Sequence, residues 1–187
     1  MTVASPSMTT AELLALPENG TDRWLVAGEL RECPMPTRNR FHSRAMTCTA
    51  TELELWLRTQ APPRGQVLTG DAGVRLRRNP DTTVGVDVVY ISADVLTRQT
   101  ANTTIVDGVP ILAVEILSPS DMVEQVNEKI DSYLDAGVSW VWVLEPHRRT
   151  VTTYRPGAEP ELFTLRDELF EDSILPGFRV QVSKLFD

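Results

Sequence analysis

Two nearly unbroken apolar runs constrain the fold of this chain more than any other feature. Val84–Ile91 is interrupted only by Gly85 and Asp87. Ile111–Leu117 is interrupted only by Glu115. Strands that are apolar on both sides belong to the centre of a sheet that is covered on both faces. The two runs therefore predict a central sheet with helices packed against each side.

Helical periodicity and capping residues predict three helices beside this sheet. They are a short helix that Thr9 and Glu12 cap ahead of Pro17, an amphipathic helix marked by Met46, Ala50, Leu53 and Leu57 that ends before Pro62, and a helix from about Ser120 to Ala136 with Asp121 and Glu124 at cap spacing and Gly137 as its stop. Since the third helix lies between two strand-like runs, a parallel crossover and an α/β core are expected.

Shorter apolar runs predict the remaining strands. They are Trp24–Glu32 with Gly28 inside it, Val67–Leu68 and Val74–Leu76 around a hairpin or bulge at Gly70, Asp71 and Gly73, and Ser139–Leu144 and Thr150–Tyr154 with a turn near Pro146. A loop rich in proline and arginine is expected from Pro34 to Arg44. The opening segment, residues 1–7, is expected to be frayed.

The composition favours one soluble, cytoplasmic domain over residues 1–187. With 42% hydrophobic and 24% charged residues, the chain has an ordinary globular balance. No apolar run approaches the ~20 residues that span a bilayer, and residues 1–10 lack the pattern of a signal sequence. The only cysteines and histidines are Cys33, Cys48, His42 and His147. With two cysteines and two histidines, the chain cannot form a disulfide framework, a four-cysteine zinc site or a histidine-rich metal site.

The charge balance limits how the chain can bind nucleic acid. Acids outnumber bases 26 to 18, for a net charge of −8. This excludes a broad basic surface that holds nucleic acid by charge alone, but it leaves a local basic groove open. The only lysines are Lys129 and Lys184, and the other basic residues are arginines. A GC-rich genome would account for the arginines. A lysine retained in such a chain raises the question of which role at that position arginine cannot fill.

The two acids inside the apolar runs are expensive to bury. Asp87 is flanked by valines and Glu115 by Val114 and Ile116. An unpaired buried carboxylate costs several kcal/mol, so such groups are paired or bind a metal. One alternative is a structural acid that binds a backbone group or an arginine. If the two strands pair, both carboxylates can converge on one cation, and hard oxygen ligands suit Mg²⁺ or Mn²⁺.

A helical wheel of the third predicted helix places Lys129 at the edge of its buried stripe. With Met122 at zero and about 100° per residue, Lys129 lies near −20° and Tyr133 near 20°. The opposite face carries Glu124, Glu128, Asp131 and Asp135. One alternative is that the aliphatic part of the Lys129 side chain packs against apolar surface while its amine reaches water. Another is a simple ion pair of Lys129 with Glu115 or Asp87. Phosphodiester hydrolysis gives a chemical reason for the lysine, because it needs a compact positive group near the attacking water.

These residues occur in a characteristic order. The segments are GVDVVYIS, VEILSPSD, EKIDSYLDAGV, SWVWVLEP and LPGFRVQVSKLF. From Leu13 to Phe186, the chain resembles the Uma family of restriction-endonuclease-like proteins in the PD-(D/E)XK nuclease superfamily. The resemblance implies a restriction-endonuclease-like core, in which a mixed central sheet is flanked by helices and extended by an N-terminal helix and strand. It also implies a divalent metal, Mg²⁺ or Mn²⁺, and cleavage of DNA phosphodiester bonds.

The resemblance also implies roles for individual residues. Asp87 and Glu115 correspond to the two metal-binding acids. Val86 stands where a proline usually precedes the first acid, and Leu117 stands where the superfamily's basic motif has lysine. In this family the lysine is thought to come from the following helix, and Lys129 fits that role.

Several other residues are weaker candidates. Glu29 is either a supporting ligand or an exposed acid beside a turn. His42 either approaches a phosphate or assists proton transfer, or it is a solvated loop histidine. The Arg38, Arg40 and Arg44 cluster and the Arg75, Arg77 and Arg78 cluster either grip a phosphate backbone or are solvated surface. Asp71 is expected to form a turn, and Trp140 and Trp142 suit core or dimer packing.

We therefore expect a metal-dependent DNA endonuclease, assembled as a homodimer whose two sites cut both strands. The alternative is a catalytically silent module of the same fold that binds DNA or a protein. A glycosidase with Asp87 and Glu115 as its pair ranks last. It needs carboxylates about 5–10 Å apart and leaves Lys129 unexplained.

Overall fold

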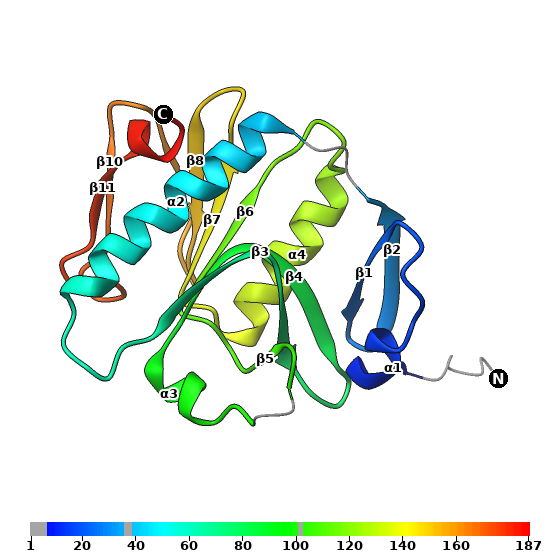
Figure 1. Ribbon diagram of the computed structural model, residues 1–187. Coiled ribbons are helices and arrows are strands. Elements are labelled where there is room, and N and C mark those ends of the chain that lie inside the picture. Colours follow the sequence, from blue (N-terminus) through cyan, green and yellow to red (C-terminus); the bar gives the residue numbers. More distant parts are fainter. Residues whose placement is uncertain (1–6, 36–38, 101–102) are drawn as a thin grey trace.

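The structure is a computed structural model that describes residues 7–35, 39–100 and 103–187. Helices are interspersed among the strands up to α4, and only strands follow until the 3-10 helix at the end (Figure 1). They are α1 (Thr10–Leu14), β1 (Thr21–Val26), β2 (Glu29–Pro34), α2 (Arg40–Thr59), β3 (Gln66–Arg77), β4 (Thr82–Ile91), α3 (Ala93–Thr97), β5 (Val106–Asp107), β6 (Leu112–Ile116), α4 (Val123–Ala136), β7 (Trp140–Glu145), β8 (Thr150–Tyr154), β9 (Glu161–Phe163), β10 (Glu168–Phe170), β11 (Arg179–Gln181) and the 3-10 helix η1 (Val182–Leu185). Of the segment expected to be frayed, only Ser7 lies within the described residues.

A large mixed sheet forms the centre of the molecule. Its strands follow the order β2-β1-β4-β6-β7-β8-β9, and β3 pairs with both β4 and β5. The neighbours β6 and β7 are parallel, with Glu115 opposite Val143, and α4 connects them. The predicted crossover and the mixed sheet flanked by helices are therefore confirmed. The N-terminal extension is confirmed as α1 and the β1–β2 hairpin.

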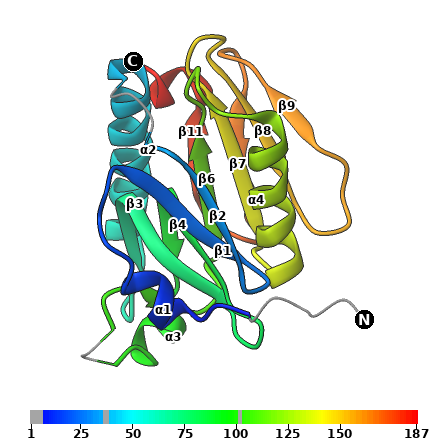
Figure 2. The same ribbon diagram turned by 90° about the vertical axis from the view of Figure 1, so that its right-hand side faces the viewer.

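Helices cover both faces of this sheet, with α2 on one side and α4 on the other (Figure 2). Alternate residues of β6 and β7 point to opposite sides. Val114 and Trp142 join the apolar cluster that includes residues of α2, while Ala113 and Val143 join the cluster that includes residues of α4. Since Glu115 is odd-numbered like Ala113, its side chain lies on the α4 face. Core packing of Trp140 and Trp142 is confirmed, because both are buried with ring centroids 4.9 Å apart.

The prediction of a single strand over Trp24–Glu32 is wrong. The chain reverses at Ala27 and Gly28, and β1 and β2 pair as an antiparallel hairpin. Both turn residues have positive φ, 50° and 78°, which is the conformation that a tight two-residue hairpin turn requires. Gly28 adopts it without strain, but alanine is rarely found there, so the turn carries a weak sequence signal.

Two helices begin at other residues than the sequence predicted. The helix α2 begins at Arg40, within the expected loop, because Asn39 caps it by accepting the N–H of Phe41. The helix α4 begins only at Val123, and its N-cap residue makes no side-chain capping bond. Asp121, expected to cap this helix, accepts the N–H of Ser118 instead, at 2.7 Å.

The hairpin or bulge predicted around Asp71 is a bulge. One long strand, β3, runs through this region, and its register with β4 shifts between Thr69 and Ala72. Asp71 has a φ of 61°, so it takes the turn-like conformation expected of it inside a strand rather than between two strands.

The sheet forks at β4, and this fork positions the site described below. Because β3 pairs along the whole of β4 on one edge, β1 and β6 share the other edge. The β1 pairing is at Thr83, and the β6 pairing begins at Val88. In the described part of the chain, residues 84–87 of β4 therefore face no strand on that edge.

Within the described ranges, no helix combines the length and the apolar composition needed to cross a bilayer.

Candidate active site

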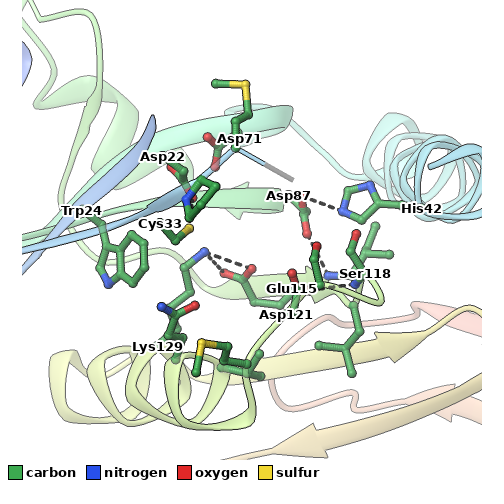
Figure 3. Close-up of a pocket in the computed structure, with 18 of the residues that line it drawn as sticks. Asp22, Trp24, Cys33, His42, Asp71, Asp87, Glu115, Ser118, Asp121 and Lys129 are labelled. Carbon is green, nitrogen blue, oxygen red and sulfur yellow. Dashed lines mark hydrogen bonds and ion pairs between the residues drawn. The ribbon is translucent and has the colours of Figure 1, made fainter. Parts of the chain in front are cut away.

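A pocket of about 660 Å³ opens at the fork of the sheet (Figure 3). Its charged lining consists of Asp22, Asp71, Asp87, Glu115, Asp121, Lys129 and His42. Its apolar lining includes Trp24, Met35, Met46, Leu117, Met122 and Val126. The structure thus brings Asp87, Glu115 and Lys129 together in one pocket, from a central strand, its neighbour and the crossover helix.

Asp87 bridges the two strands where their pairing stops. Its Oδ2 atom accepts the backbone N–H of Ile116 at 2.8 Å. Its Oδ1 atom lies 3.2 Å from Nε2 of His42, and its side chain is 17% exposed. The carboxylate is therefore held from two sides and still reaches the pocket.

Glu115 is the most enclosed acid of the site. Its side chain lies on the α4 face of β6, where the hydroxyl of Tyr133 donates to Oε1. The Nζ atom of Lys129 lies 3.3 Å from Oε2. Burial raises the pKa of Glu115 to about 7, although Lys129 and Tyr133 act in the opposite direction. The group therefore takes up and releases its proton close to neutral pH.

Lys129 points inward from α4 toward Glu115 (Figure 3). Its side chain is 17% exposed, and Nζ donates to the carbonyl of Gly85 at 3.1 Å. Gly85 lies in the unpaired stretch of β4, so the lysine satisfies a carbonyl that the fork leaves open. Burial pushes the pKa of Lys129 down, but the carboxylates of Glu115 and Asp87 outweigh burial and raise it above its usual value. The ammonium therefore stays charged.

His42 lies in the first turn of α2 and points at Asp87 (Figure 3). Its side chain is only 19% exposed, so the alternative of a solvated loop histidine is wrong. The hydrogen bond to Asp87 raises the pKa of the imidazole, despite the opposing effect of burial. The imidazole therefore takes up a proton more readily than an isolated histidine does.

Glu29 and most of the arginine clusters lie away from this site. Glu29 is exposed and pairs with Arg31 at 3.0 Å. Both Arg75 and Arg78 pair with Asp107. The two arginines, Arg75 with the larger effect, lower the pKa of the Asp107 carboxyl to about 2. Arg77 donates to the carbonyl of Asp135, and Arg44 donates to the carbonyl of Asp187. Arg40 lies over the Phe41 ring. Arg38 is outside the described residues.

Tyr133 and Asp71 are site residues to which the sequence assigned no such role. Tyr133 follows Lys129 by one helical turn, which is the signal that points to it in retrospect. The carboxylate of Asp71 lies so close to Gly85 that a Cβ there would be 1.9 Å from Oδ1. Although Asp71 is exposed overall, partial burial and the charge of Asp22 raise its pKa.

Comparison with known proteins identifies the family. A family model described as "Uma2: Putative restriction endonuclease" matches residues 10–183. The chain belongs to the Uma2 family. A crystal structure from Anabaena variabilis, described as "a putative nuclease belonging to DUF820", has the same fold, with a TM-score of 0.77 and 21% identity over 96% of this chain and 97% of that one. A search of curated proteins gave no match.

Membership of the Uma2 family confirms the predicted resemblance and supports a nuclease role. The match in fold confirms the restriction-endonuclease-like core. The roles of Asp87, Glu115 and Lys129 within that core stay predictions.

The donor set of this Uma2 site fits a hydrated hard cation. Among the described residues, no three Asp, Glu, His or Cys side chains come together closely enough to enclose a metal. Mg²⁺ does not require such a cage, because it keeps several waters and binds through one or two carboxylates. Asp87 and Glu115 supply that number of carboxylates, and five carboxylates line the pocket against one lysine and one histidine. This excess of negative charge favours a divalent cation.

Proposed function

We propose that the chain is a metal-dependent endonuclease that hydrolyses DNA phosphodiester bonds. Asp87 and Glu115 would hold the ion, Mg²⁺ or Mn²⁺, and Lys129 would aid water activation or stabilise transition-state charge. The observation that carries this proposal is the convergence of Asp87, Glu115 and Lys129 on one pocket at the fork of the sheet. Membership of the Uma2 family supports it.

The chemistry divides between the ion and the chain. A bound divalent ion would polarise a phosphoryl oxygen and lower the pKa of a water molecule. The Asp87 carboxylate is held in place by Ile116 and His42, and the Glu115 carboxylate by Tyr133 and Lys129. Both acids are therefore oriented before an ion arrives, which reduces the reorganisation that binding requires.

Lys129 suits the transition state of this reaction. Its ammonium is charged and sits inside a partly closed pocket, where a fixed positive charge acts more strongly than in water. The compact ammonium contacts both the Gly85 carbonyl and Glu115, and a guanidinium is bulkier and does not deprotonate. The choice of lysine at this position, in a chain whose basic residues are nearly all arginines, is consistent with that requirement.

A cleavage assay with paired metal titration tests the proposal. The purified chain is incubated with plasmid, linear duplex and single-stranded DNA in Mg²⁺, Mn²⁺ or EDTA. We expect cleavage that EDTA abolishes and that is lost in Asp87→Asn. The matched control is Asp131→Asn, which changes an exposed acid of α4 outside the pocket. Calorimetry with Mn²⁺ should show heat in the wild type and none in Asp87→Asn.

One observation favours a second candidate, a catalytically silent module of the same fold. Both acids have positively charged or titratable partners within the chain, since His42 faces Asp87 and Lys129 faces Glu115. A silent module predicts no cleavage of any DNA and no Mn²⁺ heat that depends on these carboxylates. The homodimer and the cytoplasmic location stay predictions, as does the single domain over residues 1–187.

A further inference from the structure

The ammonium of Lys129 must be held in one place if it is to act on the reaction. A lysine side chain is long and flexible, and it loses rotamer freedom when it is fixed. A charge that stabilises a transition state has to point at its target before the reaction begins. Two contacts of the ammonium come from the central strands, namely the Gly85 carbonyl of β4 at 3.1 Å and the Glu115 carboxylate of β6 at 3.3 Å. A third contact comes from the N-terminal hairpin.

The ring of Trp24 in β1 supplies this third contact. The Nζ atom of Lys129 lies over the indole ring, 5.9 Å from the ring centroid. The negative face of an aromatic ring attracts a cation within about 6 Å, and tryptophan attracts it more strongly than tyrosine or phenylalanine does. Figure 3 shows the Trp24 ring and the Glu115 carboxylate on either side of the Lys129 amine. The ammonium thus lies between an aromatic face and a carboxylate.

The pairing of β1 with β2 fixes this ring beside the lysine. Trp24 stands opposite Arg31 in the hairpin. Arg31 donates to the carboxylate of Glu128, from Nε at 3.0 Å and from Nη2 at 2.8 Å. Since Glu128 directly precedes Lys129 in α4, the hairpin is attached to α4 at the residue next to the lysine. Trp24 is only 3% exposed, so its ring is enclosed and offers almost no surface to a substrate.

We propose that Trp24 is a positioning residue for Lys129. Its indole ring keeps the ammonium in the pocket, at the place from which it acts on the scissile phosphate. An aliphatic side chain would fill space there, but it would not offset the water contacts that the ammonium gives up in the pocket. This inference rests on the proposed nuclease function, under which Glu115 also holds the metal ion, whereas the Trp24 ring has no part in metal binding.

Lysine-specific NMR tests the contact without any cleavage. The chain contains only two lysines, Lys129 and Lys184, so protein grown with isotope-labelled lysine gives two Cε–Hε signals. Lys184 lies exposed in η1 and provides the reference, and the variant Lys129→Met assigns the two signals. Protons over the face of an indole ring resonate upfield. We therefore expect an upfield Lys129 signal in the wild type and a shift toward the Lys184 position in Trp24→Leu.

A milder variant and a matched control accompany this measurement. Trp24→Phe keeps a smaller aromatic ring, so its Lys129 signal should lie between those of the wild type and Trp24→Leu. This variant provides the comparison if Trp24→Leu fails to fold. Trp140→Leu is the control, because Trp140 is an equally buried indole (2% exposed) that packs in the apolar cluster on the α2 face of the sheet. It should leave the Lys129 signal unchanged.

Cleavage kinetics test the consequence for the reaction. We expect Trp24→Leu to lower kcat by about tenfold, the scale of a cation–π contact removed from water, and Trp24→Phe to recover part of that loss. KM should change by less than about twofold, because Trp24 offers the substrate almost no surface. Trp140→Leu should keep the wild-type kcat at a temperature at which it is folded.

The outcomes separate this inference from the proposed function. If the wild type cuts DNA and Trp24→Leu leaves either the Lys129 signal or kcat unchanged, Trp24 does not position the lysine, and an unchanged signal in Trp24→Phe counts in the same way. An equal loss of kcat in Trp140→Leu also overturns the inference, because it would reflect a general weakening of the fold. A wild type that cuts no DNA overturns the proposed function, and the Lys129 signal then still decides whether Trp24 holds the ammonium.

Discussion

The carboxylate of Asp87 accepts the N–H of Ile116 at 2.8 Å, just beyond the last position at which β4 and β6 pair. The side chain thus replaces a backbone acceptor at the fork, and Asp87 has a structural role beside its proposed catalytic one. A substitution at this position must therefore distinguish the two.

Asp87→Asn and Asp87→Ala should separate these roles. Asparagine keeps an amide oxygen that can accept the Ile116 N–H, so its unfolding free energy should stay within about 1 kcal/mol of the wild type. Alanine leaves that N–H without its partner and should lose about 1–3 kcal/mol. Both variants should lose cleavage by at least about 100-fold, because the proposed metal site loses the negative charge of one carboxylate. Urea denaturation and a cleavage assay measure the two effects; equal stability of the variants would contradict the structural role.

Lys129→Met should weaken the protein in a pH-dependent way. Without the ammonium, an ionised Glu115 is left in a buried site, which costs about 3–5 kcal/mol. Below a pH of about 7 Glu115 is largely protonated, so the loss should be smaller there. Cleavage should fall by at least about 100-fold.

Lys184→Met is the matched control for that variant, since it removes the chain's other lysine from an exposed position in η1. Its stability and cleavage should equal those of the wild type. A stability loss in Lys129→Met that is the same at pH 5.5 and pH 8 would contradict the pairing with Glu115.

Tyr133→Phe should impair the site without disturbing the core. The ring is fully buried and stays in place, while Glu115 loses the hydrogen bond from the hydroxyl. A hydrogen bond to a charged group contributes about 1.5–3 kcal/mol, so unfolding at pH 8 should become easier by about that amount. The Mn²⁺ affinity should fall as well. Tyr154→Phe is the control, because the Tyr154 hydroxyl has no hydrogen-bond partner among the described residues; equal losses in both variants would show that Tyr133 has no special role.

Glu115 should make the folded state less stable as the pH rises. Burial raises the pKa of this carboxyl from 4.5 to about 7, so the folded chain holds the proton more tightly than the unfolded chain does. Its contribution to the unfolding free energy therefore falls as the pH rises from about 4.5 to about 7, by up to about 3 kcal/mol. Glu115→Gln lacks this slope. The raised pKa of His42 acts in the same direction, but both proteins carry it, so the difference between their pH curves isolates Glu115. Parallel curves from urea denaturation at pH 5 and pH 8 would refute the assignment.

The parts of the fold that local sequence could predict are those whose signals lie within one segment. The apolar run around Glu115 predicted β6, and Gly137 ended α4 as expected, with a φ of 93°. The β1–β2 hairpin was missed because its turn relies on positive φ at Ala27, which alanine seldom adopts. The start of α4 was misplaced because Asp121 bonds Ser118 rather than a helix N–H.

The sequence by itself determined which groups are unusual. A charge inside an apolar run is costly wherever the run is buried, so Asp87 and Glu115 stood out without coordinates. The helical period likewise placed Lys129 on the inward side of its helix. Both signals are local, because they depend only on neighbours along the chain.

Only the tertiary structure decided what these groups face. Pairing between strands distant in sequence opened the fork at residues 84–87, and this gave Lys129 the Gly85 carbonyl and gave Asp87 the Ile116 N–H. The approach of His42 from α2 depends on how that helix packs across the sheet. Such contacts arise from the balance of packing over the whole molecule, which no single segment of the sequence encodes.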